Sequence, residues 1–121
     1  MARQLDVVKG TLELLVMKTL SAGTPLHGFG VLRWIRDATE DALLIEEGAL
    51  YPALHRMEQR GWIAGEWRIS EKGRRAKYYA LTPAGRKQLV RQETEWLAYL
   101  RAWERISAAA GAAAASRLVR T

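Results

Sequence analysis

Apolar residues near the start of the chain recur at helical spacing on two separate stripes. One stripe comprises Val8, Leu12, Leu15 and Thr19, and the other comprises Val7, Leu14 and Met17. A helix that is apolar on two sides must be covered on both sides. We therefore expect the first helix to lie between other elements.

The segment TPLHGFGVLRWIRDAT, which starts at Thr24, predicts a second helix. Thr24 can cap its N-terminus, and Pro25 supplies a first-turn residue whose φ is already set. Phe29, Leu32 and Ile35 are expected to form the side that faces the core.

The segment EEGALYPALHRMEQRGWI, residues 46–63, predicts a third helix. Leu50, Leu54 and Met57 recur at spacings of four and three, which places them on one buried side. Pro52 has no N–H and is suited to a first turn, so we expect the helix to begin near Gly48. The outward residues are Gly48, Tyr51, Pro52, His55 and Gln59, with Arg56 on the flank.

The segment that follows alternates like a β-strand, turns around the letters EKG and returns. Before the turn, one face has Ile63, Gly65, Trp67 and Ile69, and after it the chain returns through Lys77, Tyr79 and Leu81. This pattern predicts a two-stranded hairpin with an arginine-rich tip. The alternation sends Tyr79 inward, so we expect it in the core.

The last part of the chain predicts a long helix that begins with a Thr82 cap and Pro83. Its apolar positions are Leu89, Trp96, Tyr99 or Leu100, Trp103 and Ile106. At about 1.5 Å per residue, a helix of about 25 residues would be roughly 37 Å long. One small core cannot cover that length, so its apolar stripe should be covered by a second copy of the chain. The alanine-rich tail could prolong the helix or fray, and we assign it no function.

The order helix, helix, helix, hairpin predicts a mainly α fold with a small β-hairpin. It is the order of a winged helix-turn-helix, in which the third helix enters the major groove of DNA and the hairpin contacts backbone or minor groove. We expect the DNA-binding domain over residues 5–81, a C-terminal dimerisation helix over residues 82–110 and the tail over residues 111–121.

Composition limits the other possibilities. The 121 residues suffice for one domain, and without cysteine there are no disulfides, thiolate metal sites or cysteine nucleophiles. Two histidines alone cannot make a zinc cluster, so we expect no metal and no cofactor. The chain also starts without the pattern of a secretory signal and lacks an apolar run of membrane-spanning length, which predicts a cytoplasmic protein without membrane contact.

The formal net charge is +6, and the excess of positive charge is local. The segment from Glu66 to Arg91 contains eight basic residues and two acidic ones. Such a cluster indicates a polyanion as partner, double-stranded DNA in particular, although a solvated cationic surface remains the alternative.

The outward face of the third helix then becomes a candidate DNA-binding surface. Small Gly48 and Ala49 let the helix backbone approach DNA, and Tyr51, His55 and Arg56 can reach phosphates or base edges. Packing roles remain open for Tyr51 and His55. On the hairpin, three cations are candidates for phosphate contacts: Arg74, Arg75 and Lys77.

The candidate dimer interface combines the stripe of the last helix with the second side of the first helix. Its residues are Leu14, Met17, Leu89, Trp96, Leu100 and Trp103. Aromatic residues at helical spacing are more often packing residues than cofactor sites, which favours a seam between two copies.

Other classes of protein have less support. The chain has no paired carboxylates with a histidine, no metal-ligand spacing and no glycine loop placed to hold phosphates, so we expect no catalytic residues and no enzyme. A winged helix that binds a protein partner without sequence-specific DNA binding is the alternative function. That alternative does not require the local positive charge, and strong salt sensitivity of duplex binding would separate the two.

Four segments resemble the PadR family of bacterial transcriptional regulators over about residues 5–105: KGTLELLVMKTL, PLHGFGVL, EGALYPALHRMEQRGWI and GRRAKYYALTPAGRKQL. The resemblance implies a homodimer that binds an operator, usually as a repressor, and in several branches is released by a small molecule or a stress signal. The long last helix resembles the dimerisation arm of the short form.

The resemblance also extends to single residues of the family's motifs. Tyr51 and Pro52 match the Tyr-Pro pair of the recognition helix. Arg74, Arg75 and Lys77 match the basic wing, and Tyr79 and Leu81 match its structural strand. Ala49 departs from the hydroxyl residue found in many relatives, which puts a contact or cap there in doubt.

Trp96 lies fourteen residues after Thr82. This spacing matches the tryptophan of the multidrug-binding branch, which faces its symmetry mate across the dimer. The resemblance therefore makes Trp96 a possible binding residue for a planar apolar small-molecule effector, with dimer packing as the alternative.

Overall fold

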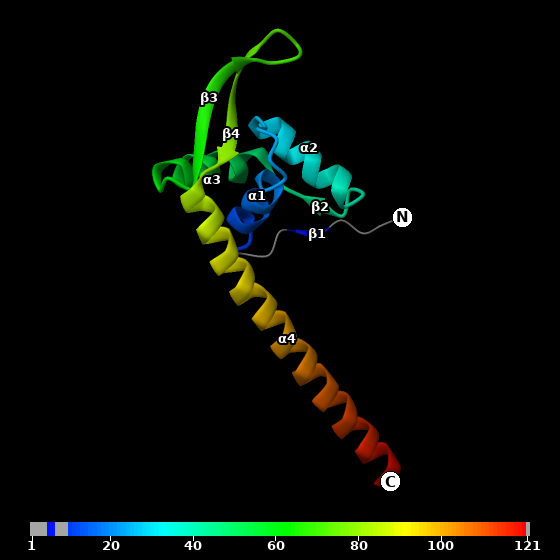
Figure 1. Cartoon of the computed structure of the whole chain (residues 1–121). Coiled ribbons are helices and arrows are strands. Elements are labelled where there is room, and N and C mark those ends of the chain that lie inside the picture. The colour runs from blue at the N-terminus through cyan, green and yellow to red at the C-terminus, as the bar shows by residue number, and fades with distance from the viewer. Residues whose placement is uncertain (1–4, 7–9, 121) are drawn as a thin grey trace. The chain divides into compact units, whose positions relative to one another are not determined.

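The computed structural model describes residues 5, 6 and 10–120 and contains four helices and four strands within them. The elements, labelled in Figure 1, are β1 (Leu5–Asp6), α1 (Leu12–Leu20), α2 (Gly28–Ala38), β2 (Leu43–Leu44), α3 (Glu47–Gln59), β3 (Ile63–Ile69), β4 (Arg75–Leu81) and α4 (Pro83–Arg120). They form two units, Met1–Leu89 and Val90–Thr121. The first unit has the predicted three helices and hairpin.

The core of the first unit lies where α1 meets α2, α3 and β4. Val16 and Met17 of α1 are fully buried, as are Leu50, Leu54 and Met57 of α3. The prediction that the first helix is covered on more than one side is therefore confirmed. Val7 and Val8, which were expected on this helix, lie outside the described residues, and α1 begins at Leu12.

The start of α2 differs from the prediction. Leu26 exchanges two backbone hydrogen bonds with Tyr79 of β4, at 3.1 and 2.9 Å, and this pairing holds residues before the helix extended. The helix is capped instead by His27, whose Nδ1 accepts a hydrogen bond from the Gly30 N–H at 2.9 Å. The expected roles of Thr24 as cap and of Pro25 as first-turn residue were wrong.

The expected core face of α2 was correct in two of three positions. Leu32 and Ile35 are buried, but Phe29 is 52% exposed. Val31 provides the third buried apolar side chain on this helix. Because α2 starts later than expected, Phe29 lies in its first turn, at the edge of the core.

α3 begins at Glu47, within one residue of the expected start. Pro52 is the sixth residue of this helix, so the expectation that it lies in the first turn was wrong. Proline lacks the N–H that would bond to the Gly48 carbonyl. Both residues are exposed, so water can satisfy that carbonyl and the helix continues.

β3 and β4 form the predicted antiparallel hairpin, with Ile63 opposite Leu81 and Ile69 opposite Arg75. Its base is buried, since Ile63 is 1% exposed and Tyr79 is buried as predicted. Burial also raises the pKa of the Tyr79 hydroxyl. Figure 1 shows the other end of the hairpin projecting beyond the three helices.

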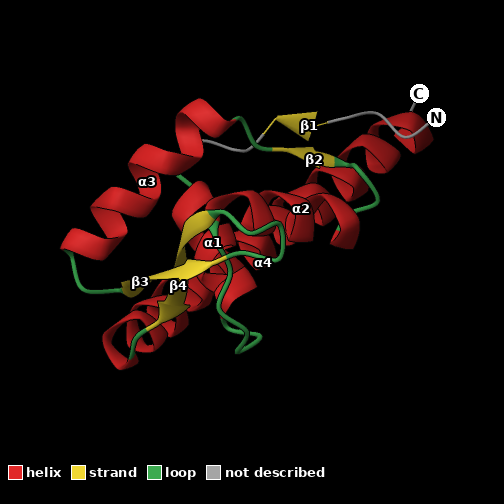
Figure 2. Ribbon diagram, turned by 90° about the horizontal axis from the view of Figure 1, so that it is seen from above, coloured by secondary structure: helices red, strands yellow, loops and turns green. Residues whose placement is uncertain are grey.

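A short parallel pairing was missed by the sequence reasoning. β1 lies beside β2, with Leu5 opposite Leu43 and Asp6 opposite Leu44, as Figure 2 shows. Two-residue strands have no alternation long enough to be recognised in a sequence.

α4 begins at the predicted cap, where the Gly85 N–H donates to Thr82 Oγ1 at 2.9 Å. Leu89, near its start, is buried in the core of the first unit. The helix has 38 residues and runs to Arg120, so the alanine-rich segment prolongs it beyond the length expected.

Candidate nucleic-acid interface

The outward face of α3 is exposed, as the spacing predicted. Leu50 and Leu54 hold the helix in the core, while Gly48, Ala49, Tyr51, Pro52, His55, Arg56 and Gln59 are exposed. The small residues near the N-terminus of the helix and the aromatic and basic residues after them therefore occupy an accessible surface. Such a surface can approach DNA without disturbing the core.

Tyr51 is positioned by close packing against α2. A Cβ atom on Gly28 would lie 2.6 Å from Cε1 of Tyr51 and 2.9 Å from its hydroxyl oxygen, so a larger residue there would displace the ring. The Tyr51 side chain is nevertheless 48% exposed. It therefore combines a packing contact on one side with an accessible surface on the other.

Arg56 lies on the flank of α3 and faces α1. Its Nε is 3.7 Å from Oε1 of Glu13, and Nη1 of Arg60 is 3.4 Å from Oε2 of the same carboxylate. These partly exposed pairs are weak individually. They neutralise part of the positive charge on this flank and leave the Arg56 side chain half exposed.

Lys77 already has an ionic partner within the chain. Its Nζ lies 2.7 Å from Oε1 of Glu58 on α3. Gly65 leaves the space that this contact needs, because a Cβ atom there would collide with the Lys77 side chain. The hydrogen bond to Glu58 raises the pKa of Lys77. The pair links β4 to α3, a connection that the sequence pattern did not reveal.

The other cations of the hairpin are more exposed. Arg75 stacks on Trp67, with its guanidinium carbon 4.7 Å from the ring centroid. Arg74 is exposed in the turn, where its N–H donates to Ser70 Oγ at 3.3 Å. Arg68 was missed by the sequence reasoning; it lies 5.4 Å from the ring centroid of Tyr78 and 3.3 Å from the Glu66 carboxylate. Alternation alone could have identified it as a residue on the opposite face of the hairpin.

A cleft of about 1110 Å³ lies between the start of α2 and the hairpin. Arg33, Tyr51, Arg75 and Tyr78 are among its lining residues. Tyr78 meets the His27 ring edge to face, with 5.1 Å between the centroids. The cleft brings together cations and aromatic rings from three elements, which suits a phosphodiester backbone.

The candidate dimer residues occupy two different environments. Met17 and Leu89 are buried by their own unit, so neither side chain is exposed for contact with a second copy. Leu14 is partly buried against the core. On α4, Leu100 and Trp103 are exposed and Trp96 is intermediate. The dimer expectation therefore depends mainly on the stripe of α4.

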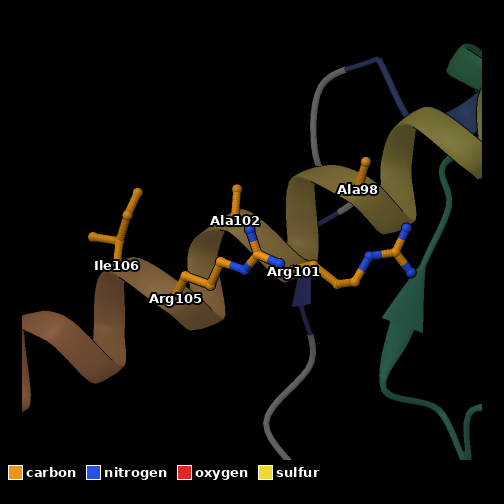
Figure 3. A pocket seen from close by; sticks show the side chains of 5 residues that line it. All are labelled: Ala98, Arg101, Ala102, Arg105 and Ile106. Carbon is orange, nitrogen blue, oxygen red and sulfur yellow. The ribbon is translucent and has the colours of Figure 1, made fainter.

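Two features of α4 bear on ligand binding. The Trp96 and Tyr99 rings stack, with centroids 6.1 Å apart and planes inclined by 10°. A shallow strip on an adjacent side is lined by Ala98, Arg101, Ala102, Arg105 and Ile106. Figure 3 shows that all five side chains of this strip come from one helix, so it has no opposing wall. The strip is a helix surface that a partner could cover, not an enclosed cavity.

The family model of the transcriptional regulator PadR-like family matches residues 16–91, which include the exposed α3 face and the hairpin. The chain belongs to this PadR-like family. Membership implies DNA binding and confirms the resemblance seen in the sequence. The family consists of transcriptional regulators and not of enzymes, as expected.

Curated proteins and solved structures agree with PadR membership. The chain is 35% identical over 70 residues to the transcriptional regulator Rv3488 of Mycobacterium tuberculosis, covering 57% of this chain and 61% of that protein. A transcriptional regulator from Clostridium thermocellum is 27% identical with a TM-score of 0.72, covering 80% and 93% of the two chains. A PadR-like transcription factor from Bacteroides fragilis is 31% identical with a TM-score of 0.67, covering 81% and 91%.

The described residues, 5, 6 and 10–120, lack two further features. No three His, Asp or Glu side chains there come together in a group that could hold a metal ion. No helix there, α4 included, is both long and apolar enough to cross a membrane.

Proposed function

We propose that this PadR-like regulator is a homodimeric repressor that binds specific sites in double-stranded DNA. The main support is that the exposed face of α3 and the cationic hairpin are joined by an ion pair. In this pair, Nζ of Lys77 lies 2.7 Å from Oε1 of Glu58. α3 would enter the major groove, and Arg74 and Arg75 would contact phosphates beside it.

Dimerisation is supported by the apolar surface of α4. Trp103 is 62% exposed and Ile106 is 64% exposed, and they belong to one helical stripe with Leu100. Exposed stripes of this kind are typical of contact surfaces. A twofold dimer would present two recognition helices to a palindromic site, and the bound dimer would repress by excluding the transcription machinery.

A ligand response is a second proposal, supported by the stacked rings of Trp96 and Tyr99. A second copy would contribute an equivalent pair, and a planar apolar effector could insert between the two by aromatic stacking. Such a ligand lowers operator affinity only by its differential affinity for the two states of the dimer.

Selection from a pool of random duplexes tests the proposed function. We expect the full chain to enrich one palindromic motif and to lose affinity steeply with salt, because phosphate contacts release counterions. The Arg74→Ala/Arg75→Ala variant should bind the enriched duplex more weakly and with a smaller salt dependence. Failure to enrich any sequence, combined with salt-independent binding, would favour the protein-interaction alternative.

A further inference from the structure

Two large apolar side chains lie exposed on the distal half of the hairpin. Trp67 is 56% exposed and Ile69 is 70% exposed, whereas Ile63, at the base of the same strand face, is 1% exposed. Ile69 is the most exposed large apolar side chain described within the first unit. A projecting apolar edge of this kind indicates a surface that a partner covers.

The apolar edge lies on the side of the hairpin that faces the recognition helix. The register pairs Ile69 with Arg75 and Trp67 with Lys77, and residues directly opposite each other share one face of a hairpin. Lys77 extends from that face to Glu58 of α3. The apolar edge and the exposed face of α3 can therefore be covered by one ligand.

The charges around the edge favour a nucleic acid as that ligand. Between Glu66 and Lys77 the chain has five basic residues and two acidic ones. Arg75 lies over the Trp67 ring, and Arg74 and Lys72 are exposed in the adjoining turn. An apolar edge surrounded by cations matches the minor groove, where cations meet phosphates and apolar side chains meet sugars and base steps.

The length of the hairpin fits the spacing of the grooves. At about 3.3 Å per residue, Ile69 lies roughly 20 Å along the strand from the buried Ile63. Half a turn of B-DNA, which separates neighbouring major and minor grooves, is about 17 Å. With α3 in the major groove, the tip of the hairpin can therefore reach the next minor groove.

We propose that Trp67 and Ile69 form a minor-groove contact in which Ile69 wedges against a flexible pyrimidine–purine base step. This inference rests on the proposed DNA binding. Arg75 holds Trp67 against the sugar edge, and Ile69 enters the step. Because TA and CA steps unstack at lower cost than stiff A-tracts, the wedge adds specificity at a position that α3 does not contact.

The experiment uses the full chain and the duplex that it enriches, with a TA step and a neighbouring 2-aminopurine introduced in the minor groove next to the half-site, half a turn from the major groove proposed for α3. We expect binding to raise 2-aminopurine fluorescence, because the wedge unstacks the base. Ile69→Ala should abolish that rise and weaken binding about tenfold, which is within the range that one mismatched base pair costs. Trp67→Ala should weaken binding to a similar degree. The matched control, Leu44→Ala, removes a side chain that is 40% exposed and lies outside the hairpin, and should change neither readout.

A second duplex, with the TA step replaced by AA, sharpens the test. It should bind the wild type about tenfold more weakly and leave the affinity of Ile69→Ala unchanged. Equal affinity and equal fluorescence for the wild type, Ile69→Ala and Trp67→Ala would overturn the wedge while leaving DNA binding intact. A wild type that binds no duplex would overturn the proposed function, and the wedge with it.

Discussion

The two units of the chain use similar apolar residues with opposite results. In the first unit, Leu50 and Leu54 of α3 are fully buried by the other elements of that unit. In the second, Tyr99, Trp103 and Ile106 of α4 are 65%, 62% and 64% exposed. Helical spacing tells which residues share a face, but it does not tell what covers that face. The first unit therefore completes its core within one chain, whereas the apolar stripe of α4 stays exposed in a single chain, which is what the proposed dimer would cover.

The largest expected effect concerns the buried side of this comparison. Leu54→Ala should lower the free energy of unfolding by about 2–5 kcal/mol, because a fully buried leucine leaves a cavity. Urea unfolding followed by circular dichroism measures the change. His55→Ala, at the exposed neighbouring position, is the matched control and should change stability by no more than about 0.5 kcal/mol. Equal losses for both variants would contradict the assignment of faces on α3.

The next effect concerns the exposed side. Replacing Trp96, Leu100 and Trp103 by alanine should convert a dimer into a monomer at micromolar concentration, since interface aromatics often contribute about 2 kcal/mol or more each. Sedimentation velocity gives the molecular mass. Val90→Ala/Leu97→Ala is the matched control, because it removes two exposed apolar side chains from another side of α4. A wild type that sediments as a monomer would contradict the proposal that the exposed stripe of α4 is a dimer interface.

A smaller effect, on the salt dependence of DNA binding, distinguishes the exposed arginines of the hairpin from Lys77, which is paired with Glu58. Arg74→Ala/Arg75→Ala should reduce the slope of log K against log salt by about 1.8, if each arginine neutralises one phosphate at about 0.9 per contact. Lys77→Ala should change the slope less, because Glu58 already pairs with that ammonium. Titrations at several salt concentrations measure the slopes. An equal change on removing Lys77 alone and on removing both arginines would mean that the ion pair opens on DNA.

The smallest effect concerns a single hydroxyl. Tyr51→Phe should weaken binding to all duplexes by about 1 kcal/mol, the value of one ordinary hydrogen bond to a phosphate. Competition with enriched and scrambled duplexes measures it. Gly28→Ala is a useful companion, because its new Cβ atom would displace the Tyr51 ring. No change in Tyr51→Phe would make Tyr51 a packing residue, and a change at one base position would make it a base reader.

The sequence predicted the elements that depend on long periodic patterns. The buried side of α3, the hairpin with Tyr79 inside, and the Thr82 cap of α4 were all correct. The start of α2 was wrong because a tertiary pairing between Leu26 and Tyr79 overrides the local signal of Thr24 and Pro25. Local capping rules consider only neighbouring residues, so they cannot predict a backbone partner that lies more than fifty residues away.

The sequence was enough to predict most of the residues that form the candidate interface, but not which of them contact one another. Alternation and charge identified Arg74, Arg75 and Lys77, yet only the structure reveals that Lys77 is held by Glu58 and that Gly65 makes room for the contact. Likewise, the apolar stripe of α4 was evident from its spacing, whereas the burial of Met17 and Leu89 depends on the packing of the whole first unit.

Footprinting of the full chain on its enriched duplex examines both proposed roles in one experiment, namely DNA recognition by the first unit and dimerisation through the second. A homodimeric repressor should protect two half-sites related by twofold symmetry, with two chains bound per duplex. The centres of the half-sites should lie about 34 Å apart, which is one helical turn, or a multiple of that distance. A single asymmetric footprint with one chain per duplex would contradict this proposal.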